Sequence, residues 1–263
     1  MSNKNWEVIR GEGPILATAI HNGHQVRESL AQRMSLSDSA RLQEEDPFTG
    51  RWTEIVDNRI ILNTSRFEVD LNRPREKAVY ATPADCWGLK VWHEDLEQAE
   101  IESSLSVYDS YYAELRTILE EMKEKHGTFV VYDIHNYNHR RNGPDAPPED
   151  PELNPQVNLG TGSMNKQKWG GIVDAFMNRM ASYNYPGGNL DVRENVKFKG
   201  GYMSQWIHQE FPESGCCLAI EFKKFFMDEW TGTGFEDHIN HIKKALQSTI
   251  QPVLDELKKV TVG

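Results

Sequence analysis

Four polar positions in this sequence follow or interrupt apolar runs of strand length. His21 ends the run ILATAI, His135 ends TFVVYDI, Glu221 interrupts CCLAIEF, and the segment from Arg66 to Arg73 precedes a strand-stopping proline. In an open α/β sheet, ligands bind beyond the carboxyl ends of the strands. A charged side chain buried there without a partner is costly, so we expect these groups to partner one another or a shared ion.

A zinc site is one arrangement that would satisfy the histidines. Zinc takes imidazole and carboxylate ligands in a tetrahedral set and keeps one position open for water when it is catalytic. His21 and His135 would supply imidazoles, and Glu45 and Asp46 are candidate carboxylates. No compact metal signature such as HExxH or paired CxxC occurs in the chain. Spacing alone therefore leaves open the alternative that both histidines bond to backbone carbonyls.

Arginines in the stretch SRFEVDLNRPRE could bind an anionic substrate. The planar guanidinium recognises a carboxylate through two parallel hydrogen bonds, and both Arg66 and Arg73 lie in this stretch beside Asn72. The alternative is a structural ion pair in which Asp70 or Glu68 neutralises an arginine.

Glu221 is a candidate general base. Burial on an apolar strand raises the pKa of a carboxyl group, and a base works best when its pKa lies near the working pH. The alternative is an ion pair with Lys223 or Lys224 at an exposed strand end. We expect another histidine pair, His238 and His241, on a solvated helix face, because their segment EDHINHIKK is charged and amphipathic.

Strand patterns alternate with helical patterns, which favours an α/β fold with a mostly parallel sheet. The remaining apolar pattern predicts one or two strands within residues 59–76 and a short strand at 157–162. Helices are predicted at 26–46, 96–125, 168–183 and 235–260, and Pro252 is expected to kink or divide the last one. The acidic, proline-rich residues 143–155 are expected to form a surface loop within one domain spanning residues 1–263.

Composition narrows the function classes. The chain has 263 residues, and its 29 Lys and Arg against 40 Asp and Glu give a net charge of −11, which argues against a general nucleic-acid or anionic-membrane binder. Three cysteines cannot make a disulfide framework. The N-terminus lacks the apolar region of a signal peptide, and no segment approaches a membrane span. A cytoplasmic location is the simplest expectation.

In order along the chain, several segments resemble the N-formylglutamate amidohydrolase family. They are AIHNGH, EEDPFTG, SRFEVDLNRPRE, VVYDIHN, VNLGTGS, FKGGYMSQW and LAIEFKKFFMDE. The resemblance extends from about residue 14 to about residue 230, and the DLNRP block and the GGY…IE…MDE tail are its most specific parts. It implies the zinc carboxypeptidase and aspartoacylase fold group: a three-layer α/β/α sandwich with a mixed, mostly parallel sheet.

The resemblance also implies one divalent metal, zinc, and a small anionic substrate. Its metal ligands would be His21, His135 and Asp46, with Glu45 as the alternate to Asp46. The implied reaction is hydrolysis of an N-acyl acidic amino acid, foremost N-formyl-L-glutamate to formate and glutamate, at the end of histidine breakdown.

Further roles follow from the same resemblance. Arg66 would polarise the scissile carbonyl, Asn72 and Arg73 would hold a substrate carboxylate, and Glu221 would activate water. Two positions depart from the family pattern: Asn136 stands where serine is usual, and Tyr112 where a histidine is usual. These departures leave room for another N-acyl amino acid or a small peptide as substrate, or for a family member that binds without turnover.

Overall fold

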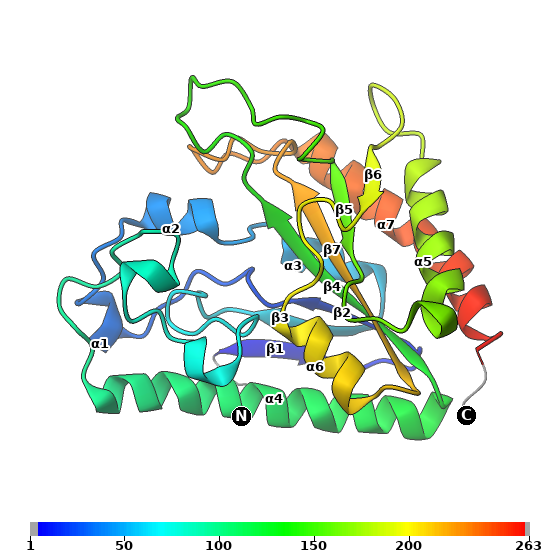
Figure 1. The fold of residues 1–263 in the computed structure, drawn as a ribbon, viewed down its shortest axis with the longest axis horizontal. Coiled ribbons are helices and arrows are strands. Elements are labelled where there is room, and N and C mark those ends of the chain that lie inside the picture. The colour runs from blue at the N-terminus through cyan, green and yellow to red at the C-terminus, as the bar shows by residue number, and fades with distance from the viewer. Residues whose placement is uncertain (1–4, 261–263) are drawn as a thin grey trace.

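The computed structural model describes residues 5–260, and one mixed sheet runs through them (Figure 1). Its seven strands are arranged in the order β1-β3-β2-β4-β7-β5-β6. Their bounds are β1 Trp6–Ile9, β2 Ile15–Ala19, β3 Asn58–Leu62, β4 Phe129–Tyr137, β5 Val157–Gly160, β6 Val192–Glu194 and β7 Gly215–Lys223.

Four neighbouring strands in the centre of the sheet run parallel. β3 pairs with β2, β2 with β4 and β4 with β7, all in the parallel sense, whereas β1 runs antiparallel to β3 and β5 antiparallel to β7. The carboxyl ends of β2, β4 and β7 therefore meet at one edge. Residues that follow or end these strands are brought together there without being close in sequence.

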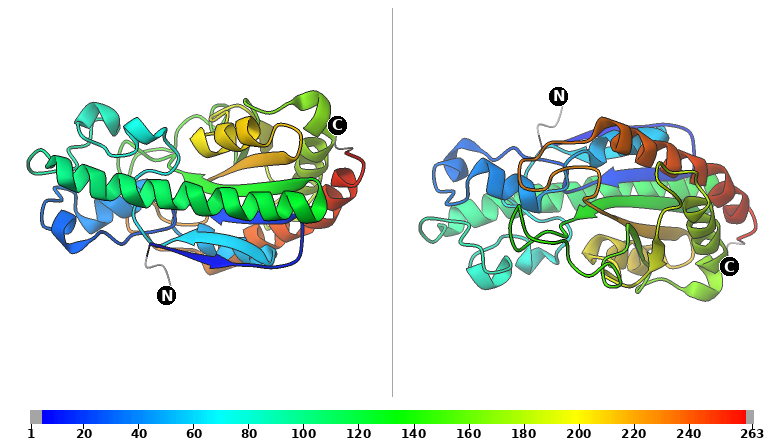
Figure 2. Two further views of the ribbon diagram at one scale, coloured as in Figure 1. Left: turned by 90° about the horizontal axis from the view of Figure 1, so that it is seen from below. Right: turned by 90° about the horizontal axis from the view of Figure 1, so that it is seen from above.

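Helices cover both faces of the sheet (Figure 2), so the predicted three-layer α/β/α sandwich is confirmed. One face packs on α4 (Gln98–His126) and α6 (Tyr202–Glu210), and the other on α5 (Lys166–Ala181) and α7 (Glu236–Leu257). Side chains alternate along the strands: Val130, Tyr132 and Ile134 enter the α5/α7 core, whereas Phe129 and Val131 enter the α4/α6 core. The same alternation directs Asp133 and His135 toward the α4/α6 side.

Local signals set the ends of the long helices. Glu97 and Glu100 form a capping box at the start of α4, and Gly127, with φ 77°, ends it in a conformation that glycine tolerates. Pro252 lies inside α7, which continues to Leu257 instead of dividing. The three shorter helices are α1 Glu28–Ala31, α2 Asp38–Glu44 and α3 Thr49–Trp52.

One predicted helix is divided in the structure, and of the one or two strands predicted within residues 59–76 only the first is formed. Residues 26–46 form two short helices, α1 and α2, and α2 begins anew at Ser37, whose side chain accepts the Ala40 N–H. Residues 63–74 leave the sheet after β3 because the Asp70 carboxylate gathers its neighbours: it accepts the Asn72 N–H at 2.8 Å and the Arg66 guanidinium at 2.8 Å. Side-chain hydrogen bonds of this kind replace the ladder of a second strand.

Several other expectations hold. Residues 143–155 form neither helix nor strand, as predicted for a surface loop, and all three cysteines are free and buried. Within residues 5–260, no helix combines the length and apolar character needed to cross a bilayer.

His208 of α6 completes the ladder of β7 where β5 has ended. Its Nε2 accepts the Cys217 N–H at 3.0 Å, so Nδ1 carries the proton and faces the Ser163 hydroxyl at 2.8 Å. Burial lowers the pKa of His208 to about 4, below the ordinary 6.5.

This depressed pKa predicts a pH-dependent contribution to stability. Between pH 6.5 and pH 4, His208 is protonated in the unfolded chain but neutral in the folded protein. The stability that the folded environment of His208 contributes is therefore complete above pH 6.5 and is lost as the pH falls toward 4. We expect the difference in free energy of unfolding between wild type and His208→Gln to shrink by about 2 kcal/mol between roughly pH 7.5 and pH 5. Urea unfolding at several pH values measures it, and a difference independent of pH would contradict the assignment.

Candidate active site

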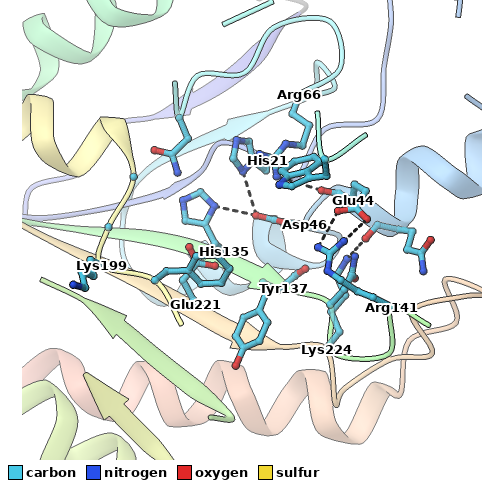
Figure 3. A pocket seen from close by; sticks show the side chains of 18 residues that line it. His21, Glu44, Asp46, Arg66, His135, Tyr137, Arg141, Lys199, Glu221 and Lys224 are labelled. Carbon is cyan, nitrogen blue, oxygen red and sulfur yellow. Dashed lines mark hydrogen bonds and ion pairs between the residues drawn. The ribbon is translucent and has the colours of Figure 1, made fainter. Parts of the chain in front are cut away.

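Two histidines and one aspartate meet at the carboxyl ends of β2 and β4 (Figure 3). Asp46 Oδ2 lies 2.9 Å from His135 Nδ1 and 3.4 Å from His21 Nδ1, and all three residues are buried. The two rings lie edge to face with centroids 4.9 Å apart. His21 follows β2, His135 belongs to β4, and Asp46 is held next to His21 because its backbone N–H bonds to the His21 carbonyl at 2.9 Å. Their ligand atoms lie within 4.8 Å of one another.

A second carboxylate backs each histidine. His21 Nε2 forms a hydrogen bond with Asp70 Oδ1 at 2.7 Å, whereas His135 Nε2 lies 3.0 Å from Asp133 Oδ1 in an ion-pair contact without hydrogen-bond geometry. The hydrogen bond from Asp70 fixes the His21 ring and its tautomer, as in metal sites, and in both histidines Nδ1 faces Asp46. The ring nitrogens of both histidines therefore face carboxylates, and the alternative that they bond to backbone carbonyls is wrong.

Charge at this cluster suits a divalent cation. Asp46, Asp70 and Asp133 are buried around the histidines, and within the described residues the second oxygen of Asp133 has no hydrogen-bond partner. Burial lowers the pKa of His135, but the carboxylates of Asp133 and Glu221 outweigh it and raise that pKa well above its usual value. The site thus attracts positive charge, and two imidazoles with one carboxylate are ligands suited to zinc.

Asp70 joins the cluster to the segment that follows β3. Its carboxylate contacts His21, the Asn72 N–H, Arg66 and the Tyr80 hydroxyl. Burial raises the pKa of Asp70, but Arg66 and His21 more than compensate and hold it well below the ordinary value. The predicted ion pair between Asp70 and an arginine therefore exists, and it is part of the site.

Glu221 stands beside His135 in the register of β4 and β7. It is partly buried and lines the same pocket as the cluster. Burial raises the pKa of Glu221 to about 7, helped by the charges of Asp46 and Asp133 and opposed by His135. The alternative ion pair is not formed: Lys223 donates to the Asn154 carbonyl, and Lys224 to the carbonyls of Gln43 and Glu45.

The pocket has a volume of about 220 Å³, the scale of a small metabolite. Arg66 and Asn72 line it together with the cluster and Glu221. Arg73 is outside the lining; its guanidinium lies 5.3 Å from the Tyr80 ring centroid and 5.9 Å from that of Trp87, which does line the pocket.

Glu45 is directed away from the cluster. Its carboxylate bonds to the Ser65 hydroxyl and to His24 Nδ1, so Asp46 is the acidic residue that faces both histidines. His238 and His241 are half-buried, not fully solvated, and they contact the hydroxyls of Tyr185 and Tyr183.

Sequence reasoning missed Asp133 and much of the pocket wall. The position of Asp133 could have been predicted from the sequence. It precedes His135 by two residues, and residues two apart on a strand face the same side of the sheet. Lys199 and Lys224 also line the pocket, but no periodic signal places them there. Of the two departures, Tyr112 donates to the Leu71 carbonyl at 2.7 Å and Asn136 to the Pro47 carbonyl at 2.9 Å, so both support the site segments.

Comparison with known proteins decides the family. Residues 13–227 match the model of the N-formylglutamate amidohydrolase family. The chain belongs to that family. The site cluster, Glu221 and the Arg66–Arg73 segment all lie within the matched residues. A search of curated proteins finds no match for this amidohydrolase-family chain.

Solved structures share the fold of this family member. An N-formylglutamate amidohydrolase from Ralstonia eutropha JMP134 superposes with a TM-score of 0.74 at 17% identity, covering 98% of both chains. A gene product from Agrobacterium tumefaciens superposes with a TM-score of 0.66 at 18% identity, covering 97% of both chains. At these identities the likeness concerns the fold.

The carboxylate behind His135 predicts a measurable effect on metal affinity. Asp133→Asn keeps the size of the side chain but removes a buried negative charge 3.0 Å from His135 Nε2, so we expect about 10- to 100-fold weaker zinc binding. Competition with a chromophoric chelator measures the affinity. Asp109→Asn, which removes a carboxylate from an exposed ion pair with Arg75, is the matched control, and equal affinities in both variants would contradict this role of Asp133.

Proposed function

We propose that this protein is a metal-dependent amidohydrolase that cleaves N-acyl acidic amino acids, foremost N-formyl-L-glutamate to formate and glutamate. The observation that carries the proposal is the convergence of His21 and His135 on Asp46, with Glu221 beside them in one pocket. Membership of the N-formylglutamate amidohydrolase family supports the reaction type. The structural neighbour from Ralstonia eutropha that carries this activity in its name supports it as well.

His21, Asp46 and His135 are the proposed metal ligands, through Nδ1, a carboxylate oxygen and Nδ1. A divalent metal held there, zinc in this proposal, supplies Lewis-acid polarisation of the substrate carbonyl and a lowered pKa for water. Asp70 and Asp133 keep the imidazoles oriented from behind.

Glu221 is the proposed general base. Its carboxylate takes a proton from the attacking water and delivers it to the leaving nitrogen, which converts a poor leaving group into a neutral amine. A base needs a pKa near the working pH, and the partly buried position of Glu221 provides one.

Arg66 is the proposed electrostatic stabiliser of the developing oxyanion. Its guanidinium bonds to Asp70, to the Tyr80 hydroxyl and to the Glu44 carbonyl, and these three contacts leave two of its five N–H groups for the substrate. Fixed donors of this kind cost no reorganisation during the reaction.

Asn72 and Arg73 are the proposed ligands of a substrate carboxylate. Asn72 is in the pocket wall, and its side-chain oxygen accepts the Met203 N–H at 3.1 Å, which orients the amide. Arg73 would reach the substrate from the rim beside Trp87.

The pocket wall favours an anionic substrate in an otherwise acidic protein. Arg66, Lys199, Arg141 and Lys224 line it, although the chain as a whole carries a net charge of −11. Local positive charge of this kind raises the concentration of anions at the site.

Replacing the proposed base separates chemistry from binding. In Glu221→Gln we expect kcat to fall by about 10²- to 10⁴-fold because the proton acceptor is lost, whereas the fold and the metal content persist. Formate release and elemental analysis measure the two. Glu213→Gln, on an exposed pair with Lys168, serves as the control, and unchanged turnover in Glu221→Gln would refute the role of base.

Metal removal and a substrate panel test the reaction itself. We expect chelation to abolish formate release from N-formyl-L-glutamate and zinc or cobalt to restore it. The reason is that the proposed mechanism depends on the metal to polarise the carbonyl and to lower the pKa of water. N-acetyl-L-glutamate and a dipeptide complete the panel. Hydrolysis of acetylated but not formylated acids would replace the proposed substrate, and activity that persists without metal would overturn the mechanism.

A further inference from the structure

Four basic side chains line the pocket, and Arg141 differs from the other three in its partners. Arg66 is bound to the buried Asp70, and Lys224 is buried and donates to the carbonyls of Gln43 and Glu45 at 2.5 and 2.9 Å. Lys199 is exposed, and its ammonium group has no hydrogen-bond or ion-pair partner among the described residues. Arg141 alone has its guanidinium fork occupied by a carboxylate at the pocket wall.

That carboxylate belongs to Glu44, the last residue of α2. The pair is bidentate, with Arg141 Nη1 and Nη2 at 2.9 and 3.1 Å from the two Glu44 oxygens. Both residues line the pocket, on the side of the cluster away from Lys199 (Figure 3). Fork-to-carboxylate pairing is also how an arginine would hold a substrate carboxylate, so Glu44 occupies the place that such a group would take.

The backbone around Arg141 is anchored, whereas its side chain is free to exchange partners. The buried carboxylate of Glu229 accepts the N–H groups of His139 and Arg140 at 3.1 and 3.0 Å, and the Trp230 indole donates to the Arg140 carbonyl at 2.9 Å. The Arg141 side chain is 40% exposed, and the Glu44 side chain that holds it is 11% exposed. The backbone anchors of the Arg141 segment do not involve this pair, so a ligand carboxylate can replace Glu44 without unfolding the wall.

We propose that Arg141 is the residue that determines specificity for an acidic side chain: it releases Glu44 and binds the side-chain carboxylate of the N-acyl amino acid. The inference rests on the proposed function and deepens it, because it explains how the pocket tells glutamate from glutamine. Asn72 and Arg66 remain available to the groups that every N-acyl amino acid shares. Lys224 and Glu229 act as positioning residues that hold α2 and the Arg141 segment at their present spacing.

The test compares N-formyl-L-glutamate with its neutral isostere N-formyl-L-glutamine. In Arg141→Gln we expect the KM for N-formyl-L-glutamate to rise about 10- to 100-fold, the loss that follows removal of a charge-assisted hydrogen-bonded pair, with kcat little changed. The KM for N-formyl-L-glutamine stays within about twofold. In Glu44→Gln the arginine loses its competitor, so the KM for N-formyl-L-glutamate falls.

Arg51→Gln is the matched control. Arg51 makes a bidentate pair with Glu236 at 2.8 and 2.8 Å and is 42% exposed, but it lies outside the pocket lining. We expect it to leave both substrates unaffected. A wild type that hydrolyses both substrates equally, or an Arg141→Gln variant that keeps the preference for glutamate, would overturn the inference while leaving the amidohydrolase function intact.

Binding of the amino-acid products gives a readout that does not depend on turnover. Calorimetry with L-glutamate and L-glutamine on the zinc-loaded protein compares the two side chains directly. If the wild type hydrolyses no N-formyl amino acid, the proposed function fails, and calorimetry still decides about Arg141. A preference for L-glutamate that Arg141→Gln abolishes supports the inference, whereas equal binding, or no binding of either product, refutes it.

Discussion

One carboxylate oxygen of Asp46 is shared by two imidazoles that come from neighbouring parallel strands, and the rest of the site is arranged around that contact. Sharing is possible because β2 and β4 run side by side and end at the same edge, so His21 and His135 meet although they are far apart in sequence. Removing these polar groups from water is costly. The hydrogen bond with Asp70 offsets part of that cost for His21, and Asp133 lies as a buried negative charge 3.0 Å from Nε2 of His135.

Asp70 extends this constraint into the irregular segment after β3. A second strand there would leave its carboxylate buried without enough donors. The backbone instead turns so that Asn72, Arg66, Tyr80 and His21 all reach it. The same turn carries Arg66 and Asn72 into the pocket wall. Local secondary structure thus gives way to the satisfaction of one buried charge.

Much of this architecture is predictable from the sequence, because it depends on periodic burial. The apolar runs around residues 15–20, 128–134 and 216–222 locate the three strands that carry the site, and the parallel order brings their ends together. The choice between Glu45 and Asp46 is not predictable in this way. It depends on which carboxylate faces inward after α2 ends, and Ser65 and His24 attract Glu45 to the other side. The Glu44–Arg141 pair is likewise a contact between the last residue of α2 and an irregular segment 97 residues away, and no periodicity predicts it.

Glu229 anchors the first residues of the long connection between β4 and β5. Glu229 follows strand β7, which carries Glu221, so the segment that carries Arg141 is anchored to the same part of the chain as Glu221. Residues 143–155 begin beyond that anchor point and form an irregular excursion. This loop returns to the anchored segment, because the Glu149 N–H donates to the His139 carbonyl at 2.7 Å and Arg140 Nη1 donates to the Ala146 carbonyl at 3.1 Å. A change in the sequence of the loop would therefore be felt by the residues that immediately precede Arg141.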